Sequence, residues 1–66
     1  MRVVVNGMER EVAEGMTGDE LLASFHLSAA TLVVELNGHV IKTTDFLDRA
    51  MLAGDSIELV TVVGGG

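Results

Sequence analysis

The 66-residue sequence lacks cysteine, proline, tryptophan and tyrosine. Without cysteine the chain has no disulfide, no thiolate metal site and no cysteine nucleophile, which agrees with a reducing compartment. Basic residues are also scarce, because four lysines and arginines stand against ten acidic residues, for a net charge of −6. Phe25 and Phe46 are the only aromatic residues. This composition argues against nucleic-acid binding, which needs positive charge and stacking surfaces, and leaves a solvated surface or a basic protein partner.

Long hydrophobic runs are missing as well. Runs such as Leu59–Val63 are far shorter than the ~20 apolar residues of a membrane-spanning helix. The first residues, Met1–Asn6, lack the apolar core and cleavage site of a secretory signal. We therefore expect a cytoplasmic protein with no membrane span. Its length suffices for one small domain, but not for an enclosed catalytic cleft.

Two Asn-Gly dipeptides, Asn6-Gly7 and Asn37-Gly38, predict tight hairpin turns, because both residues readily adopt positive φ angles. The strand-like runs around them are residues 2–6, 8–13, 32–36 and 39–42. A fifth and longest strand is predicted at residues 56–63, after a turn at residues 53–55.

Alternation along the strands predicts their buried faces. Glu9 and Glu11 alternate with mostly apolar neighbours, which indicates a half-buried second strand. In the last strand Ile57 and Leu59 should face the core and Glu58 the solvent.

One amphipathic helix is clearly marked. Thr17 and Glu20 have the spacing of a capping box, in which each side chain satisfies a backbone N–H at the start of the helix. Met16 and Leu21 can form a hydrophobic staple across that start, and the apolar stripe continues to Phe25. A second, short helix or helical turn is predicted within residues 43–52.

The predicted order is β-β-α-β-β-(short helical turn)-β. This is an α+β pattern, in which a mixed five-stranded sheet packs against one main helix, with the short helical turn before the last strand. We expect one folded domain over residues 1–63 and a flexible glycine tail over residues 64–66.

Familiar catalytic and metal-binding constellations are missing. His26 and His39 have neither cysteine partners nor helical spacing, so we predict no metal site. The serines lack a recognisable histidine and acid for nucleophilic catalysis. We therefore predict that the chain is not an enzyme on its own and binds no cofactor itself.

The tail Gly64-Gly65-Gly66 is the chemically unusual feature. Glycine lacks a side chain, so these residues can pass through a channel too narrow for any other residue and bring the terminal carboxylate to a distant site. An ionised carboxylate is a poor electrophile, so another enzyme must first join it to a leaving group such as AMP. Sulfur from a persulfide donor could then convert it to a thiocarboxylate. The alternative is a flexible end or cloning remnant without function, although the tail directly follows a predicted strand.

The whole chain resembles a known family, the small sulfur carriers of thiamine biosynthesis (ThiS), which have the ubiquitin-like β-grasp fold. The residues that carry the likeness are Thr17-x-x-Glu20-Leu21-Leu22, Val34-Glu35-Leu36-Asn37-Gly38, Ala53-Gly54-Asp55-x-Ile57-Glu58 and the ending Val63-Gly64-Gly65-Gly66. A diglycine at the last position of a chain with this pattern is its most specific part.

The resemblance implies a cycle with several partners. A ThiF-like adenylyltransferase would use ATP and Mg²⁺ to adenylate Gly66, and sulfur would come from a cysteine desulfurase system. The Gly66 thiocarboxylate would then enter thiazole synthase (ThiG) and donate its sulfur to the thiazole ring. Gly64 and Gly65 would lie in the partners' active sites; Gly65 matches a family glycine, and Gly64 stands where the family often accepts another small residue.

Three other functions share parts of this pattern. The small subunit of molybdopterin synthase uses the same tail chemistry, but that family is usually longer and tends to carry prolines before its glycines. A ubiquitin-like modifier would instead join Gly66 to a lysine of a target protein. A plain β-grasp interaction module would make no use of its glycines.

Strand parity indicates a docking surface near the tail. Val60 and Val62 share the outward parity of Glu58, as Val4 and Val33 do on their strands. An exposed apolar patch beside the tail would mark a partner surface, unless that face is simply covered.

Overall fold

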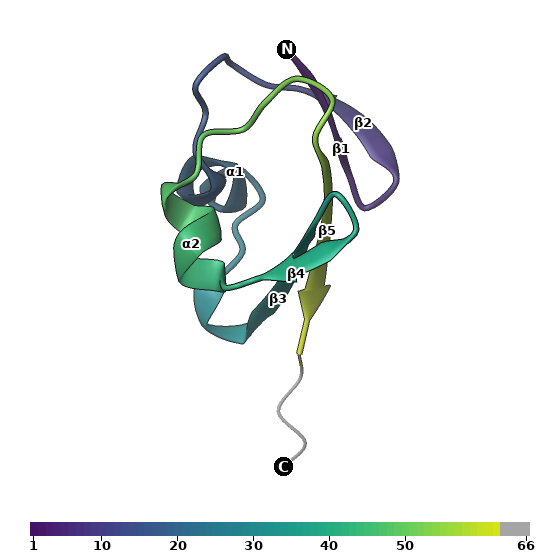
Figure 1. Cartoon of the computed structure of the whole chain (residues 1–66). Coiled ribbons are helices and arrows are strands. Elements are labelled where there is room, and N and C mark those ends of the chain that lie inside the picture. The colour runs from purple at the N-terminus through teal and green to yellow at the C-terminus, as the bar shows by residue number, and fades with distance from the viewer. Residues whose placement is uncertain (63–66) are drawn as a thin grey trace.

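A five-stranded mixed sheet covered on one face by helices forms the domain (Figure 1). The computed structural model describes residues 1–62. Its strands are β1 (Arg2–Val5), β2 (Met8–Glu11), β3 (Leu32–Leu36), β4 (His39–Ile41) and β5 (Ser56–Thr61). Its helices are α1 (Gly18–Ser24), the 3-10 turn η1 (Ala29–Thr31) and α2 (Thr43–Asp48). Apart from η1, which was not predicted, this is the predicted order of elements, and the short helix that precedes the last strand is confirmed.

The sheet order is β2-β1-β5-β3-β4, so the last strand lies in the middle. β5 pairs parallel with β1 and antiparallel with β3, while the two hairpins β1–β2 and β3–β4 flank it. Both predicted hairpin turns are confirmed, with positive φ at Asn6 and Gly7 and at Asn37 and Gly38. Because both central residues of each turn are left-handed, the turns match the twist of the strands that they join.

Helix α1 begins at the predicted capping box. Thr17 Oγ1 accepts a hydrogen bond from the Glu20 N–H, and the Glu20 carboxylate accepts one from the Thr17 N–H at 3.1 Å. Gly18, the first residue of α1, is buried against α2, and a Cβ there would overlap the carbonyl oxygen of Phe46. Glycine at this position therefore lets the two helices approach closely.

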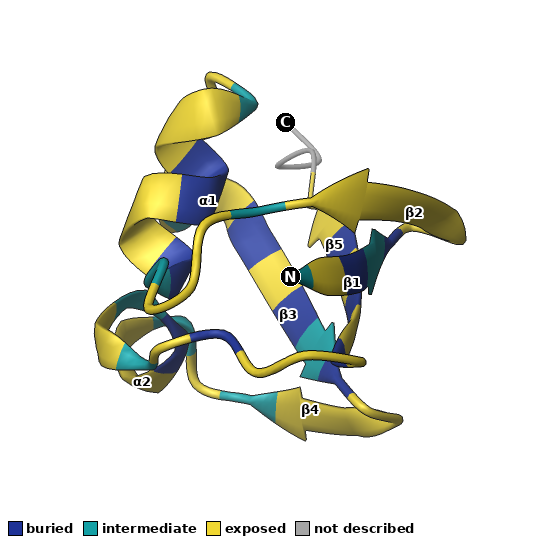
Figure 2. Cartoon of the chain, turned by 90° about the horizontal axis from the view of Figure 1, so that it is seen from above, coloured by how far each residue is buried: buried dark blue, intermediate teal, exposed yellow. Residues whose placement is uncertain are grey.

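The core lies between the sheet and the helices, and the buried residues face each other across it (Figure 2). Its members are Val3, Val5, Leu21, Leu22, Leu32, Val34, Leu36, Phe46, Met51, Ile57 and Leu59. Ile57 and Leu59 are buried and Glu58 is exposed, which confirms the predicted parity of the last strand.

Several predictions about strands are wrong. The second strand ends at Glu11, two residues earlier than predicted, and the first and fourth strands each end one residue earlier than predicted. The second strand is not half-buried: every residue of β2 is exposed, because β2 is an edge strand beyond the area that α1 covers. The last strand ends at Thr61, two residues earlier than predicted, although the Val62 N–H still donates to the Thr31 carbonyl. Residue 63 and the predicted tail, residues 64–66, lie outside the described residues.

Candidate functional site

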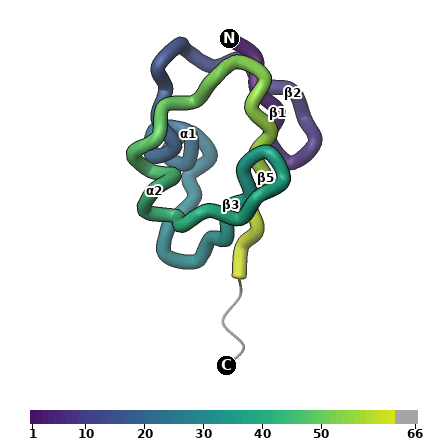
Figure 3. The backbone as a smooth tube through the Cα atoms, in the orientation of Figure 1, coloured from purple at the N-terminus to yellow at the C-terminus, as the bar shows by residue number. Residues whose placement is uncertain are grey.

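The central strand β5 carries the chain out of the domain. It leaves the sheet at the end of the molecule opposite the N-terminus (Figure 3). Five residue pairs join it to β3, from Leu36–Ile57 at its start to Leu32–Thr61 at its end. The Val62 N–H donates to the Thr31 carbonyl at 2.7 Å, so the backbone is held as far as the last described residue.

On its other side β5 outlasts β1, and a side chain replaces the missing strand. β1 pairs with β5 only as far as Val5–Ile57. The Leu59 N–H then donates to Asn6 Oδ1 at 2.7 Å, across 53 positions of sequence. Asn6 thus lies in the first hairpin turn, and its side-chain amide holds the strand that leads to the terminus. The Asn-Gly pattern predicts the turn, but nothing in the sequence predicts this partner.

The outer face of the sheet, away from the helices, is apolar beside this exit. Val60 and Val62 are 51% and 50% exposed, and Val33 lies directly opposite Val60 on β3. We call Val33, Val60 and Val62 the outer-face patch. The predicted exposure of Val60 and Val62 is thus confirmed, while their role in docking stays a prediction.

An acidic pair adjoins the outer-face patch. Glu35 and Glu58 are cross-strand partners, and their pair lies two positions along β3 and β5 from the pair Val33–Val60, on the same face of the sheet. Like charges directly opposite one another destabilise a sheet. The isolated domain therefore gains nothing from this pair, which would suit a basic group on a partner.

A buried ion pair holds the loop before β5. Asp55 is 5% exposed and accepts hydrogen bonds from Arg49 Nη1 at 2.7 Å, from the Leu52 N–H at 2.8 Å and from Asn37 Nδ2 at 3.1 Å. Burial raises the pKa of Asp55, but the hydrogen bonds from Arg49, Leu52 and Asn37 outweigh it, so the pKa lies below its ordinary value. The sequence shows no signal of this network, because an Asp and an Arg six positions apart in a loop predict no contact.

The N-terminus is fixed to the second strand. The Met1 ammonium lies 3.1 Å from Glu11 and donates to the Val12 carbonyl at 2.7 Å. Its hydrogen bond and charge lower the pKa of Glu11, with a smaller contribution from Arg2. These contacts lie far from the exit of the chain (Figure 1), so they hold the fold rather than the site.

Within residues 1–62 no three His, Cys, Asp or Glu side chains are placed to hold a metal ion. His26 has a positive φ just after α1, and His39 begins the edge strand β4. No helix in the same part of the chain is long and apolar enough to cross a membrane.

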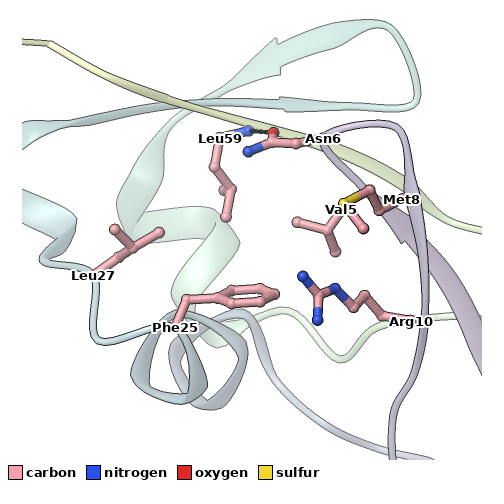
Figure 4. A pocket seen from close by; sticks show the side chains of 7 residues that line it. All are labelled: Val5, Asn6, Met8, Arg10, Phe25, Leu27 and Leu59. Carbon is pink, nitrogen blue, oxygen red and sulfur yellow. Dashed lines mark hydrogen bonds between the residues drawn. The ribbon is translucent and has the colours of Figure 1, made fainter.

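Sequence reasoning missed a pocket between β2 and the end of α1, which we call the β2–α1 pocket (Figure 4). Its volume is about 240 Å³. It is lined by Val5, Asn6, Met8, Arg10, Phe25, Leu27 and Leu59. The Arg10 guanidinium lies 5.1 Å from the centre of the Phe25 ring. Alternation along β2 could have indicated that Met8 and Arg10 share one face of the sheet. The sequence gives no signal that Phe25 and Leu27 lie opposite them, because that depends on where α1 packs.

A central last strand flanked by two hairpins, in a five-stranded sheet covered by one main helix, defines a β-grasp domain, and in the sequence this strand is followed by a terminal glycine run. A family model described as the ThiS family matches residues 3–66. The chain therefore belongs to the ThiS family, the β-grasp sulfur carriers of thiamine biosynthesis.

Solved structures agree with this assignment. The chain is 35% identical to the thiamine biosynthesis protein ThiS of Geobacter metallireducens, and each chain covers 100% of the other in its crystal structure, with a TM-score of 0.81. The solution structure of a thiamine biosynthesis protein from the same organism gives a TM-score of 0.76 at 35% identity, with 100% of this chain and 88% of that chain covered.

A longer relative is also similar. A thiazole synthase of Paramagnetospirillum magneticum is 32% identical over 66 residues, which are 100% of this chain and 20% of that protein. The chain thus spans about a fifth of the length of this relative.

Proposed function

We propose that the chain carries sulfur as a thiocarboxylate on Gly66 and delivers it to thiazole formation in thiamine biosynthesis. The observation that carries the proposal is the position of β5: a central strand, paired with β3 along its length and held on its other side by β1 and then by the Asn6 side chain, leads directly toward Val63 and the three terminal glycines. A rigid root and a tail without side chains suit a terminus that must reach into the active sites of other proteins.

Activation would occur on a partner. A ThiF-like adenylyltransferase would use ATP and Mg²⁺ to join the Gly66 carboxylate to AMP, with release of pyrophosphate. The terminal sulfur of a persulfide, supplied by a cysteine desulfurase system, would then displace AMP and form an acyl disulfide. A second thiol would reduce that disulfide and release the thiocarboxylate. In this scheme the chain is a substrate of other enzymes.

Thiazole synthase is the proposed acceptor. The thiazole synthase of P. magneticum contains a segment similar to this whole chain, which supports a close working relation between the two activities. Gly64 and Gly65 would pass through the partner's channel and place the Gly66 sulfur at its active site. The outer-face patch, with Val60 and Val62, would dock against the adenylyltransferase beside the tail.

The intact mass of the chain tests the proposal. Incubation with ATP, the adenylyltransferase and a sulfur source should replace one oxygen atom of the chain by sulfur. A variant that lacks Gly65 and Gly66 is the matched control and should keep its mass. Addition of thiazole synthase and its other substrates should then restore the original carboxylate. An unchanged mass in the first step would refute sulfur transfer, and a thiocarboxylate that thiazole synthase cannot consume would refute the acceptor.

A further inference from the structure

The β2–α1 pocket has the makeup of a binding site. Met8 and Arg10 of β2 form one wall, Phe25 and Leu27 after α1 form the opposite wall, and Val5 and Leu59 lie between them (Figure 4). Met8 is 61% exposed, although its side chain is large and apolar. A concave, mostly apolar site with one charged group at its rim is typical of sites that bind a ligand.

The charge of Arg10 is not neutralised within the described chain. Arg2 lies near Glu9 and Glu11, and Arg49 pairs with Asp55. No carboxylate of residues 1–62 lies within ion-pairing distance of Arg10, which instead lies over the Phe25 ring. In a chain with a net charge of −6, a lone guanidinium at the rim of an apolar pocket favours a ligand with a carboxylate.

The pocket also adjoins an open edge of the sheet. Met1 and Val12 exchange two backbone hydrogen bonds. Bonded pairs alternate in an antiparallel ladder, so the backbones of Arg10 and Met8 also face β1. The N–H and C=O groups of Glu9 and Glu11 therefore point away from the sheet, where an extended segment can pair with them.

We propose that the β2–α1 pocket binds an extended segment of a partner protein, which adds to the edge of β2. Every second side chain of such a strand points to the helix side of the sheet. One of them, large and apolar, fills the pocket, and a carboxylate two residues away, on the same face of the segment, contacts Arg10. This inference is independent of the tail chemistry.

Charge disfavours a second copy of this chain as the occupant. Pairing of two β2 strands would bring together the Glu9 and Glu11 side chains of both copies, and like charges on neighbouring strands repel. The pocket and the outer-face patch lie on opposite faces of the sheet, because Met8 and Arg10 have the parity of the core residues Val5 and Val3. A partner in the pocket thus leaves Val60 accessible.

The test is an NMR titration of the full-length, ¹⁵N-labelled chain with the capped octapeptide Thr-Ile-Thr-Glu-Thr-Ile-Thr-Glu, whose isoleucines and glutamates share one face of a strand. We expect saturable shifts at Met8–Glu11, Phe25 and Leu27, and little change at Val33 and Val60. A peptide with serine in place of isoleucine should not bind. The proposal would be overturned by an absence of shifts, by shifts confined to the outer-face patch, or by equal binding of the serine peptide. Concentration-dependent shifts at β2 without peptide would also overturn it, because they would show self-association.

Charge reversal tests the role of Arg10. Arg10→Glu should weaken binding of the glutamate peptide by about tenfold and favour a peptide with lysine in place of glutamate. Arg10→Gln should also weaken binding of the glutamate peptide. Its matched control is Arg2→Gln, because each variant removes one positive charge, from β2 or from the adjacent β1, and only Arg10 lines the pocket. Equal losses in these two variants, or no preference of Arg10→Glu for the lysine peptide, would show that the carboxylate contact is wrong. Met8→Ser should weaken binding while the dispersion of the spectrum shows an intact fold.

Discussion

Replacement of Asp55 by Asn should destabilise the domain at the loop that leads into β5. The carboxylate accepts three hydrogen bonds at 2.7, 2.8 and 3.1 Å, two of them on one oxygen. An amide can keep the oxygen toward Arg49 and Leu52 only by turning its NH₂ group toward the NH₂ of Asn37. That amide of Asn37 cannot turn over without losing its bond from the Ser56 N–H at 2.8 Å.

The expected cost follows from these contacts. The hydrogen bonds from Arg49 and Leu52 would be accepted by a neutral amide oxygen instead of a carboxylate, and the Asn37 NH₂ would face another NH₂ group without an acceptor. Together these losses cost about 2–3 kcal/mol of unfolding free energy, since a hydrogen bond to a charged group is worth about 1 kcal/mol more than a neutral one. The Arg49 side chain is 29% exposed, so water can solvate its freed charge and the cost stays below that of a fully buried pair. For a domain of this size the melting temperature should fall by roughly 10–20 °C.

Thermal and urea unfolding followed by circular dichroism measure this effect. Asp48→Asn is the matched control, because it makes the same change at an exposed position at the end of α2 and should shift stability by less than about 0.5 kcal/mol. A double-mutant cycle with Arg49→Met separates the ion pair from the other two bonds. If Asp55→Asn melts within a few degrees of the wild type, as Asp48→Asn should, the network does not stabilise the loop.

The same variant has a defined pH dependence. Because the folded pKa of Asp55 lies below its ordinary value of 3.8, its contribution is fully present above that value and is lost as pH falls through the folded pKa. The stability gap between wild type and Asp55→Asn should therefore be constant near neutral pH and narrow in acid. Glu11 also has a lowered pKa, but it is unchanged in the variant and cancels from the gap. A gap that does not narrow in acid would contradict the assigned pKa direction.

Three further changes probe other parts of the molecule. Val60→Glu should weaken adenylyltransferase binding in a pull-down or calorimetric assay yet leave the fold intact, whereas Leu52→Glu, at another exposed apolar position, should bind normally; unchanged binding of Val60→Glu would sink the docking hypothesis. Gly18→Ala should destabilise the domain by about 1–3 kcal/mol, because its Cβ overlaps the Phe46 carbonyl, and a neutral effect in urea unfolding would show that α2 moves freely. Thr17→Ala should cost about 1 kcal/mol in the same assay, and a Thr17→Ser variant should restore most of it.

Local signals in the sequence predicted the elements well. The Asn-Gly turns and the capping box of Thr17 and Glu20 are each specified by residues within four positions of one another, so their geometry depends little on the rest of the chain. The inward parity of Ile57 and Leu59 was equally clear, because alternation on a strand is also local.

Features that depend on non-local pairing were not predictable in the same way. The exposure of β2 follows from its place at the edge of the sheet, and alternation along the strand does not report that place. The contact of Asn6 with Leu59 and the stacking of Arg10 on Phe25 require strand order and helix position to be known first. The sheet order itself came into reach only through the resemblance to the ThiS family.

The outer face of the sheet carries a like-charge pair that does not stabilise the fold, whereas the buried polar groups of the domain are satisfied. This difference points to function. Buried polar groups elsewhere are satisfied: Asp55 has three donors, and no buried side-chain polar atom of residues 1–62 lacks a partner. Yet Glu35 and Glu58 stand opposite each other beside exposed valines, where a Lys or Thr at either position would stabilise the free domain. Fold stability alone gives no reason for this arrangement. When it binds, a partner with an apolar centre and a basic residue would cover the exposed valines and neutralise the repulsion between Glu35 and Glu58, next to the strand that leads to the tail.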